Sequence, residues 1–196
     1  MTRIGIIGAG GHGKVVADTA TAAGWEKIEF FDQSWPGRQT IGSWPIVGAD
    51  PKGDRLFCAV GRNAIRASLF EDYHLDDSPI LIHPSVILSP SVQIGAGSLL
   101  VAGAIVNADA KIGRGAILNT GCSIDHDCTI GDFTHISPGA RLAGAVALGD
   151  RSWVGIGAVI REGVTIGKDV MIAAGAAVTE DVLDGARIGG VPAKSI

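Results

Sequence analysis

The chain has 196 residues, 46% of them hydrophobic and 29 of them glycine, and its net charge at pH 7 is −4. This length allows one large or two small domains, and the composition is that of a strand-rich and turn-rich globular protein, not a disordered one. Because the sequence has no basic tract, nucleic acids and anionic membranes are poor partners, and its longest apolar run is too short to span a membrane. The first residues lack the charged start, apolar block and cleavage site of a signal peptide, so we expect a cytoplasmic protein.

Residues 1–81 alternate short apolar runs with segments of helical character. We expect a strand, a helix and a second strand at Ile4–Ile7, Lys14–Ala23 and Ile28–Phe31. A loop containing Pro and Trp follows, with Trp35, Pro36, Trp44 and Pro45. A strand, a helix and a last strand are then expected at Leu56–Val60, Asn63–Tyr73 and Ile80–Ile82. This alternation predicts a small parallel α/β sheet, a short Rossmann-like unit, as the first domain.

A glycine loop connects the first strand to the first helix. Gly8, Gly10 and Gly13 match the pattern G-x-G-x-x-G, and Asp32 follows about twenty residues later, as in the dinucleotide-binding fingerprint. The underlying physics is less specific, because the free N–H groups of a helix N-terminus favour any phosphate. Since only one βαβαβ half precedes the next segment, one nucleotide is favoured over the two of NAD. The alternative is that these glycines only allow close packing of helix and strand.

The remaining residues, 82–196, follow a different pattern. Every sixth residue from Ile82 to Val178 is aliphatic, and the fifth position of each hexapeptide is small or β-branched. One large and one small inward side chain per six residues suit the core of a narrow coil. A helix would show periods of three and four and an ordinary strand a period of two, so a period of six predicts a hexapeptide-repeat solenoid.

This repeat resembles the left-handed parallel β-helix of the hexapeptide acyltransferases, in which three hexapeptides form one triangular coil. The resemblance implies such a β-helix over residues 82–196, with about five to six coils. Cys122 and Cys128 occupy small inward positions, and Cys58 lies in an apolar segment. We therefore interpret all three cysteines as core thiols and not as redox or metal groups.

His126 is the main candidate for chemistry within the repeat. Asp125 and Asp127 flank it, and a carboxylate beside an imidazole raises its pKa and can hold one tautomer, as a general base requires. Counting one coil in either direction places Ala108 and Gly144 beside His126, which leaves room for a ligand. A surface histidine in a polar corner is equally compatible with the spacing alone.

Further columns of residues follow from the same count. His135 aligns with Trp153, and Pro138, Ile156 and Ala174 form another column, which would line a shallow groove. A zinc site of the carbonic-anhydrase type needs three convergent histidines. Only His126 and His135 lie in the middle coils, with His83 at the far edge, so we expect no metal.

Three motifs together narrow the interpretation: the glycine loop Gly-x-Gly-Gly-His-Gly-Lys, the Ile-Asp-His-Asp-Cys segment around His126, and the ending Gly189-Gly-Val-Pro-Ala-Lys194. In this combination the chain resembles the bacterial nucleotide-sugar N-acetyltransferases related to the sialic acid O-acetyltransferases. These enzymes acetylate the 4-amino group of 4-amino-4,6-dideoxy sugars. The resemblance implies acetyl-CoA as co-substrate and a role in glycan biosynthesis. It further implies a homotrimer with active sites between subunits.

The resemblance also implies roles for individual residues. It makes His126 the general base and Asp127 the residue that strengthens it. It implies that acetyl-CoA contacts His135, Gly144, Ile156 and Ala174, with the Gly144 N–H near the acetyl carbonyl. It implies that the sugar nucleotide is held by Gly10, Gly11, His12, Asp32 and Gln33. Gln33 replaces an acidic residue of a uridine-using relative, so UDP and GDP both remain open as carriers.

Three other functions remain open from the sequence. The same base would serve a sugar O-acetyltransferase of the sialic acid type. A nucleotide-sugar-binding scaffold without catalysis would use the glycine loop as a sensor and the solenoid for oligomerisation. An NAD oxidoreductase has the glycine fingerprint as its sole support. The sequence defines neither the sugar, nor its C4 stereochemistry, nor the acyl-chain length.

Overall fold

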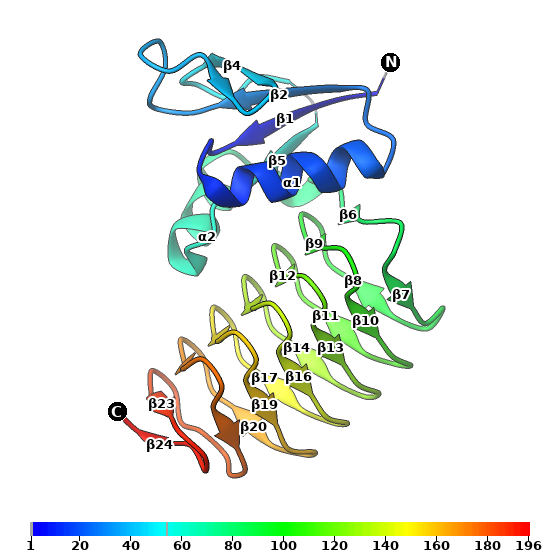
Figure 1. The fold of residues 1–196 in the computed structure, drawn as a ribbon, viewed down its shortest axis with the longest axis vertical. Helices are drawn as coiled ribbons and strands as arrows, with labels where there is room; N and C mark the ends of the chain where they lie inside the picture. The colour runs from blue at the N-terminus through cyan, green and yellow to red at the C-terminus, as the bar shows by residue number, and fades with distance from the viewer. Residues whose placement is uncertain (1, 54) are drawn as a thin grey trace.

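The computed structural model describes residues 2–53 and 55–196. It consists of a small α/β part that lies on one side of a parallel β-solenoid (Figure 1). The α/β part contains β1 (Arg3–Ile7), α1 (Gly11–Ala22), β2 (Lys27–Phe31), β3 (Thr40–Ile41), β4 (Trp44–Gly48), β5 (Leu56–Cys58), α2 (Asn63–Asp72) and the 3-10 helix η1 (Leu75–Asp77). The expected combination of a short Rossmann-like unit and a hexapeptide β-helix is confirmed. No helix of the described residues is long and apolar enough to cross a membrane.

The strands of the α/β part form one sheet in the order β3-β4-β2-β1-β5. Four strands are parallel, and β3 is antiparallel to β4. The expectation of an all-parallel sheet with a Pro/Trp loop was therefore wrong in one place. Trp44 and Pro45 belong to a hairpin, because Gly42 supplies the positive φ of 59° in its turn and the Trp44 ring packs against Phe30. Helix α1 also begins earlier than expected, at Gly11.

The solenoid has three faces made of two- or three-residue strands that repeat coil after coil. One sheet has eight strands: β6 (Leu81–Ile82), β9 (Leu99–Leu100), β12 (Ile117–Leu118), β15 (His135–Ile136), β18 (Trp153–Val154), β21 (Met171–Ile172), β23 (Arg187–Gly189) and β24 (Lys194–Ser195). A second has six: β7 (Ile87–Leu88), β10 (Ile105–Val106), β13 (Ser123–Ile124), β16 (Arg141–Leu142), β19 (Val159–Ile160) and β22 (Ala177–Val178). The third has five: β8 (Gln93–Ile94), β11 (Lys111–Ile112), β14 (Thr129–Ile130), β17 (Ala147–Leu148) and β20 (Thr165–Ile166).

Strand pairing confirms the repeat length. Within a face, each strand pairs in parallel with the strand one coil away, as His135 does with Ile117 and Trp153. Only β24 is antiparallel to its neighbour within these three sheets. The strand expected at Ile80–Ile82 belongs to the solenoid and not to the α/β sheet, because β6 pairs with β9.

The aliphatic and small positions of the repeat fill the solenoid core. From Leu100 to Val178 the sixth-residue aliphatics form one buried cluster, whereas Ile82 and Ile94, in the first coil, are partly exposed. Cys122 and Cys128 are fully buried and unpaired, and so is Cys58 in the α/β part at 2% exposure. Burial raises the pKa of Cys122 to about 12. These three thiols therefore pack as small apolar side chains.

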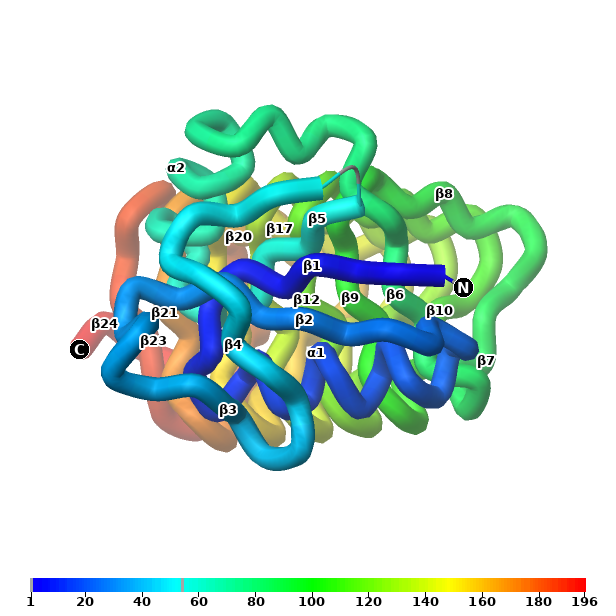
Figure 2. The backbone as a smooth tube through the Cα atoms, turned by 90° about the horizontal axis from the view of Figure 1, so that it is seen from above, coloured from blue at the N-terminus to red at the C-terminus, as the bar shows by residue number. Residues whose placement is uncertain are grey.

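The α/β part packs on the eight-stranded face. Leu81, Leu99 and Ile117 of that face share a buried cluster with Ile6 and Val16 of the α/β part. Seen from above, the strands and helices of the α/β part lie across the coils (Figure 2). The turns that join the six- and five-stranded faces lie on the side of the solenoid away from the α/β part (Figure 1), whereas Arg114, directly after β11, pairs with Glu71 and Asp76 of the α/β part.

Candidate active site

His126 and Asp127 form a hydrogen-bonded pair at the corner between the six-stranded and five-stranded faces. The His126 Nδ1 and Asp127 Oδ2 atoms are 2.8 Å apart. Asp127 has a left-handed backbone with φ of 60°, which Asp tolerates better than most residues, and its N–H donates to the Ala108 carbonyl. Asp125 is fixed beside the pair, because its Oδ1 accepts from both the His126 N–H and the Asn107 side chain.

The electrostatics of this corner make His126 a stronger base. The hydrogen bond with Asp127 and then the charge of Asp125 raise the pKa of the His126 imidazole. When Nδ1 carries the proton that Asp127 accepts, Nε2 presents its lone pair. The side chains of His126 and Asp127 are 60% and 61% exposed, so this nitrogen is open to a reactant.

Gly144 lies one coil further along, against the imidazole. A Cβ at this position would come within 2.6 Å of the Cε1 and Nε2 atoms of His126. Its carbonyl accepts from Gly163, but its N–H has no hydrogen-bond partner in the described part of the chain. A free backbone N–H is the kind of donor that stabilises a developing oxyanion in acyl transfer.

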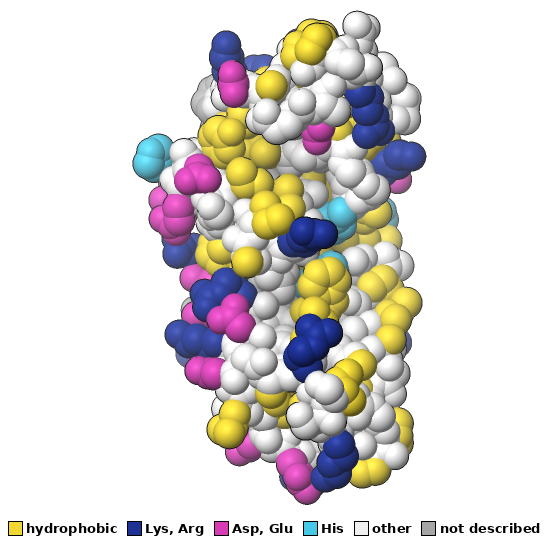
Figure 3. Space-filling model, turned by 90° about the vertical axis from the view of Figure 1, so that its left-hand side faces the viewer, with side chains coloured by type: hydrophobic (Ala, Val, Ile, Leu, Met, Phe, Trp, Pro, Cys, Tyr) yellow, Lys and Arg dark blue, Asp and Glu magenta, His cyan; other side chains and the backbone are white. Residues whose placement is uncertain are grey.

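A second group of side chains surrounds His135 on the eight-stranded face. The His135 ring is 6% exposed and stacks on Trp153, with ring centroids 4.4 Å apart. Its Nε2 lies 3.1 Å from the Asn119 amide nitrogen, and the His12 ring centroid is 6.1 Å away. Histidine side chains are visible where the α/β part meets the solenoid (Figure 3).

Both of these imidazoles are kept neutral. Burial, and then the charge of Arg66, lowers the pKa of His12 to about 4. Burial, followed by the influence of His12 and Arg66, lowers the pKa of His135 to about 3. The Gly61 backbone opposes the His135 shift but does not complete a hydrogen bond, and Nδ1 of His135 has no partner among the described residues.

The glycine loop and Asp32 meet at the carboxyl ends of β1 and β2. Asp32 accepts from the Ala9 N–H at 2.7 Å and from the Ser34 N–H at 2.9 Å. Burial opposes ionisation of Asp32, but these hydrogen bonds and that of the Ser34 side chain outweigh it and lower the pKa. A Cβ at Gly10 would meet nothing within 4 Å, whereas one at Gly13 would lie 2.6 Å from the Gly8 carbonyl oxygen. Gly13 is therefore a packing glycine, and Gly10 and its neighbour Gly11 face open space.

A cavity of about 170 Å³ opens beside this loop. It lies at the carboxyl ends of the parallel strands, where open α/β sheets bind their ligands. Of the residues that the resemblance assigns to the sugar nucleotide, Asp32 and Gln33 line this cavity, whereas Gly10, Gly11 and His12 do not. Gly8 lines it too, together with Leu69 of α2 and Tyr73 directly after that helix. The sequence carried no signal for Leu69 and Tyr73, because they reach the cavity only through the packing of a helix expected to be an ordinary crossover.

The other two residues that the resemblance assigns to acetyl-CoA lie at a different corner of the solenoid from His126. Ile156 and Ala174 are both exposed, in successive turns between the eight- and six-stranded faces. The turns are stacked in register, because the N–H of Gly175 donates to the Ile156 carbonyl and that of Gly157 to the Pro138 carbonyl. The structure therefore places Ile156 and Ala174 at one edge of the eight-stranded face that carries His135, and His126 with Gly144 at the corner between the other two faces.

Within one chain, the loop and the base are separated by the solenoid. His12, from the glycine loop, lies against His135 on the eight-stranded face, whereas His126 is at the corner between the other two faces. This separation can be followed in Figure 1. No group of three or more His, Cys, Asp or Glu side chains in residues 2–53 and 55–196 is arranged to hold a metal ion.

Comparisons with known proteins match both parts of the chain. Residues 3–73 match the PglD N-terminal domain, and residues 109–144 and 146–180 match the bacterial transferase hexapeptide (six repeats). UDP-N-acetylbacillosamine N-acetyltransferase from Bacillus subtilis (strain 168) is 39% identical over 116 residues. That alignment covers 52% of this chain and 52% of the relative, so the match spans about half the length of this curated relative.

Several solved structures match along the whole chain. The acetyltransferase domain of PglB from Neisseria gonorrhoeae FA1090, in complex with acetyl coenzyme A, is 39% identical with a TM-score of 0.92, covering 99% of this chain and 98% of that one. PerB from Caulobacter crescentus, in complex with CoA and GDP-perosamine, is 38% identical with a TM-score of 0.93, covering 100% of this chain and 98% of that one. Both alignments include the α/β part as well as the hexapeptide repeats. The chain belongs to the family of PglD-type nucleotide-sugar N-acetyltransferases with hexapeptide repeats.

Proposed function

We propose that the chain is an acetyl-CoA-dependent N-acetyltransferase that acts on the 4-amino group of a nucleotide-linked 4-amino-4,6-dideoxy sugar. The observation that carries this proposal is the contact of His126, paired with Asp127, against Gly144. A base and a free N–H beside it are the two groups that acyl transfer from a thioester to an amine requires. The Neisseria and Caulobacter relatives, which match the whole chain, contain acetyl-CoA in one case and CoA with GDP-perosamine in the other.

The reaction then proceeds by direct transfer. The sugar nitrogen attacks the thioester carbonyl while Nε2 of His126 takes its proton, and Asp127 stabilises the resulting imidazolium through Nδ1. The Gly144 N–H donates to the oxyanion of the tetrahedral intermediate. When the C–S bond breaks, the amide carbonyl re-forms and the CoA thiolate leaves, accepting the proton from His126. The supporting evidence for the histidine also includes structures of the Caulobacter enzyme with one histidine changed to asparagine or alanine.

The acceptor site is proposed at the glycine loop and the neighbouring cavity. Gly10, Gly11 and the N-terminus of α1 would hold the phosphates, because an unobstructed helix N-terminus favours anions. Asp32 and Gln33 line the cavity and would contact the nucleotide base. His135, Ile156 and Ala174 are proposed as contacts of acetyl-CoA. The Bacillus and Caulobacter relatives differ in carrier, UDP in the first and GDP in the second, so both nucleotides are candidates.

The position of the loop relative to His126 supports a site shared between copies of the chain. A solenoid stands between the two within one chain, so the acceptor on one subunit would meet His126 of another. The six-stranded face carries exposed apolar side chains, with Ile87 at 64% and Val159 at 45% exposure. The five-stranded face instead presents Gln93 and Lys111. We therefore propose a homotrimer that associates through the six-stranded face.

The activity is tested with a free-thiol assay on the purified chain, using acetyl-CoA with UDP- and GDP-linked 4-amino-4,6-dideoxy sugars. Matched sugars with a hydroxyl at C4 separate N- from O-acetylation. We expect CoA release only with an amino sugar, and none for His126→Asn. Release with hydroxyl sugars alone would make the enzyme an O-acetyltransferase, and nucleotide-sugar binding without any release would favour a non-catalytic scaffold.

The shared site is tested by complementation between two inactive variants. His126→Ala removes the base, and Gly10→Phe fills the glycine loop at a position where a Cβ meets nothing within 4 Å. Hetero-oligomers produced by co-expression should regain activity, because some sites combine an intact loop with an intact base. Activity no higher than that of the two separate variants would contradict a site between subunits.

A further inference from the structure

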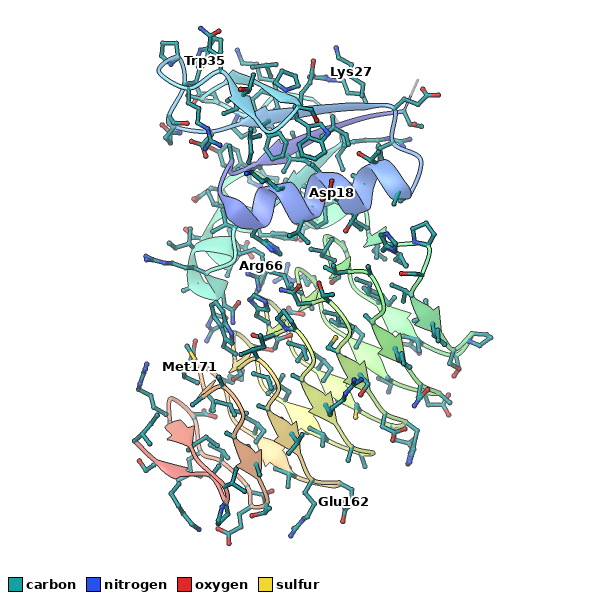
Figure 4. All side chains as sticks on the ribbon, viewed as in Figure 1. Asp18, Lys27, Trp35, Arg66, Glu162 and Met171 are labelled. Atoms are coloured by element: carbon teal, nitrogen blue, oxygen red, sulfur yellow. The ribbon has the colours of Figure 1, made fainter. Side chains whose placement is uncertain are left out.

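Arg66 is a buried cation at the boundary between the α/β part and the solenoid. It lies on α2 and is 1% exposed, between that helix and the coils (Figure 4). Its guanidinium donates six hydrogen bonds, to the carbonyls of Gly115, Val60, Gly61, Phe133 and Thr134 and to the side-chain oxygen of Asn63. Burial lowers its pKa to about 10, so Arg66 is still protonated at neutral pH.

Asn63, one helical turn before Arg66, extends the same contact to the next coil. Its amide nitrogen donates to the carbonyls of Arg151 and Ser152, at 2.9 and 3.1 Å. Gly115, Phe133 and Arg151 occupy the same turn in three successive coils, and their carbonyls accept no backbone hydrogen bond in the described part of the chain. One turn of α2 therefore binds a column of carbonyls that the solenoid itself leaves free.

Packing of the α/β part on the solenoid does not depend on Arg66 alone. Apolar contacts already join them, including the shared cluster with Leu99 and Ile117 and the edge-on packing of Phe70 against Phe133, with centroids 5.0 Å apart. A buried cation is costly to desolvate, and none of the hydrogen bonds of Arg66 is to a carboxylate. Apolar packing tolerates sliding, whereas a planar guanidinium with fixed donor directions defines one register.

The groups that Arg66 joins belong to the two halves of the proposed site. Val60 lines the nucleotide cavity, and Gly61 follows it in the loop that faces His135. Thr134 directly precedes His135 in the solenoid. Arg66 thus connects the loop beside the nucleotide to the strand that carries His135.

We infer that Arg66 is a positioning residue, which holds the nucleotide-binding part in register with the solenoid and so places the acceptor sugar for transfer. The inference rests on the proposed function. A displacement of about 1 Å of a reacting group can lower a rate by about a hundredfold, so a fixed register has a large effect on turnover. The charge of Arg66 also contributes to the low pKa values of His12 and His135.

The test compares Arg66→Met and Arg66→Lys with Arg55→Met as a matched control. Arg55 is exposed, and its side chain lies over Trp25 at the opposite end of β5 from Gly61. We expect Arg66→Met to lower kcat/KM for the nucleotide sugar at least about tenfold while KM for acetyl-CoA changes by less than about twofold. Arg66→Lys should be intermediate, because it keeps the charge without the planar fork, and Arg55→Met should match the unmodified protein.

A purely structural role would give a different pattern. Acceptor kinetics within about twofold of the unmodified protein despite a lower Tm, or a rise in KM for acetyl-CoA as large as the loss in kcat/KM for the nucleotide sugar, would overturn the inference. Should Arg66→Met fail to fold, Asn63→Ala decides, because it removes the hydrogen bonds to the carbonyls of Arg151 and Ser152 and should impair the acceptor parameters in the same direction. Unchanged acceptor parameters in Asn63→Ala would then overturn it.

Failure of the proposed function is recognised separately, as absence of acetyl transfer by the unmodified protein. Amide hydrogen exchange tests the inference without any substrate. In Arg66→Met, exchange should accelerate at Gly61 and in the strand carrying His135 while the distant solenoid coils are unaffected. Uniform acceleration, or none at these two segments, would contradict a positioning role.

Discussion

Gly144 lies against the imidazole of His126, so close that a Cβ at position 144 would come within 2.6 Å of Nε2. Because Nδ1 of His126 is engaged by Asp127, Nε2 is the atom left to accept a proton. The residue one coil after the base therefore determines the space available at the reacting atom.

Gly144→Ala should lower kcat by about tenfold to a hundredfold, because the added methyl group displaces the imidazole from its position. Gly144 does not have a positive φ, so the backbone tolerates alanine and the melting temperature should change little. Steady-state kinetics with a thermal melt checks both. Ala108→Ser, at the equivalent position one coil before His126, is the control. A Gly144→Ala protein with normal kcat would show that the imidazole moves freely without loss of function.

Removal of the base should be more damaging than removal of its partner. His126→Ala should reduce kcat by at least about a hundredfold, the typical contribution of a general base. Asp127→Asn should reduce it less, because Nε2 is retained and only the orientation and basicity of the ring are weakened. Single-turnover measurements of CoA release at saturating substrates compare the two. Near-normal turnover by His126→Ala would refute the proposed mechanism.

The pH dependence of these variants follows from the raised pKa of His126. The base must be neutral to accept a proton, so kcat should rise with pH through this pKa and then level off. Asp127 is the largest cause of the raised pKa, so Asp127→Asn should move the rising limb to lower pH. A pH profile of kcat for both proteins measures the shift. If the rising limb of the Asp127→Asn profile stayed in place or moved to higher pH, a group other than His126 would control the rate.

The sequence predicted the solenoid in detail because each coil is specified by local residues. The alignment of positions one coil apart follows from the repeat, and Gly144 beside His126 follows from the same count. The interior positions of Cys122 and Cys128 were predictable for this reason also. The hairpin that contains Trp44 was not, because its pairing depends on a tertiary contact with Phe30.

The boundary between the two parts was beyond sequence reasoning for a similar reason. Arg66 and Asn63 lie in a segment that reads as an ordinary helix, and nothing in its pattern shows that one turn matches a column of carbonyls. The separation of His12 from His126 by the solenoid was also hidden. It depends on which face the α/β part covers. Leu99 and Ile117 pack against the α/β part on that face, but the repeat pattern does not distinguish them from the corresponding residues of other coils.

Burial of His135 should make stability depend on pH. Its pKa is about 3 in the folded protein against 6.5 as the reference, so the unfolded state binds a proton below pH 6.5 that the native state does not. The contribution of His135 to the free energy of unfolding is therefore fully present above about pH 6.5. It decreases as the pH falls toward the folded pKa, by at most about 1.4 kcal/mol per pH unit. Urea unfolding between pH 7.5 and pH 4.5, compared with His135→Phe, isolates this contribution. Equal slopes for the two proteins would mean that His135 is protonated in the native state.

Association through the six-stranded face should be sensitive to charge at Val159. This side chain is 45% exposed on β19, one coil from Arg141 on β16, so Val159→Lys would bury like charges in the proposed interface. We expect this variant to sediment as a monomer and to lose at least about tenfold of its activity, because His126 would no longer meet the loop of another subunit. Thr165→Lys, exposed on the five-stranded face, is the matched control and should remain oligomeric and active. A monomeric Val159→Lys protein with full activity would show that one chain completes the site by itself.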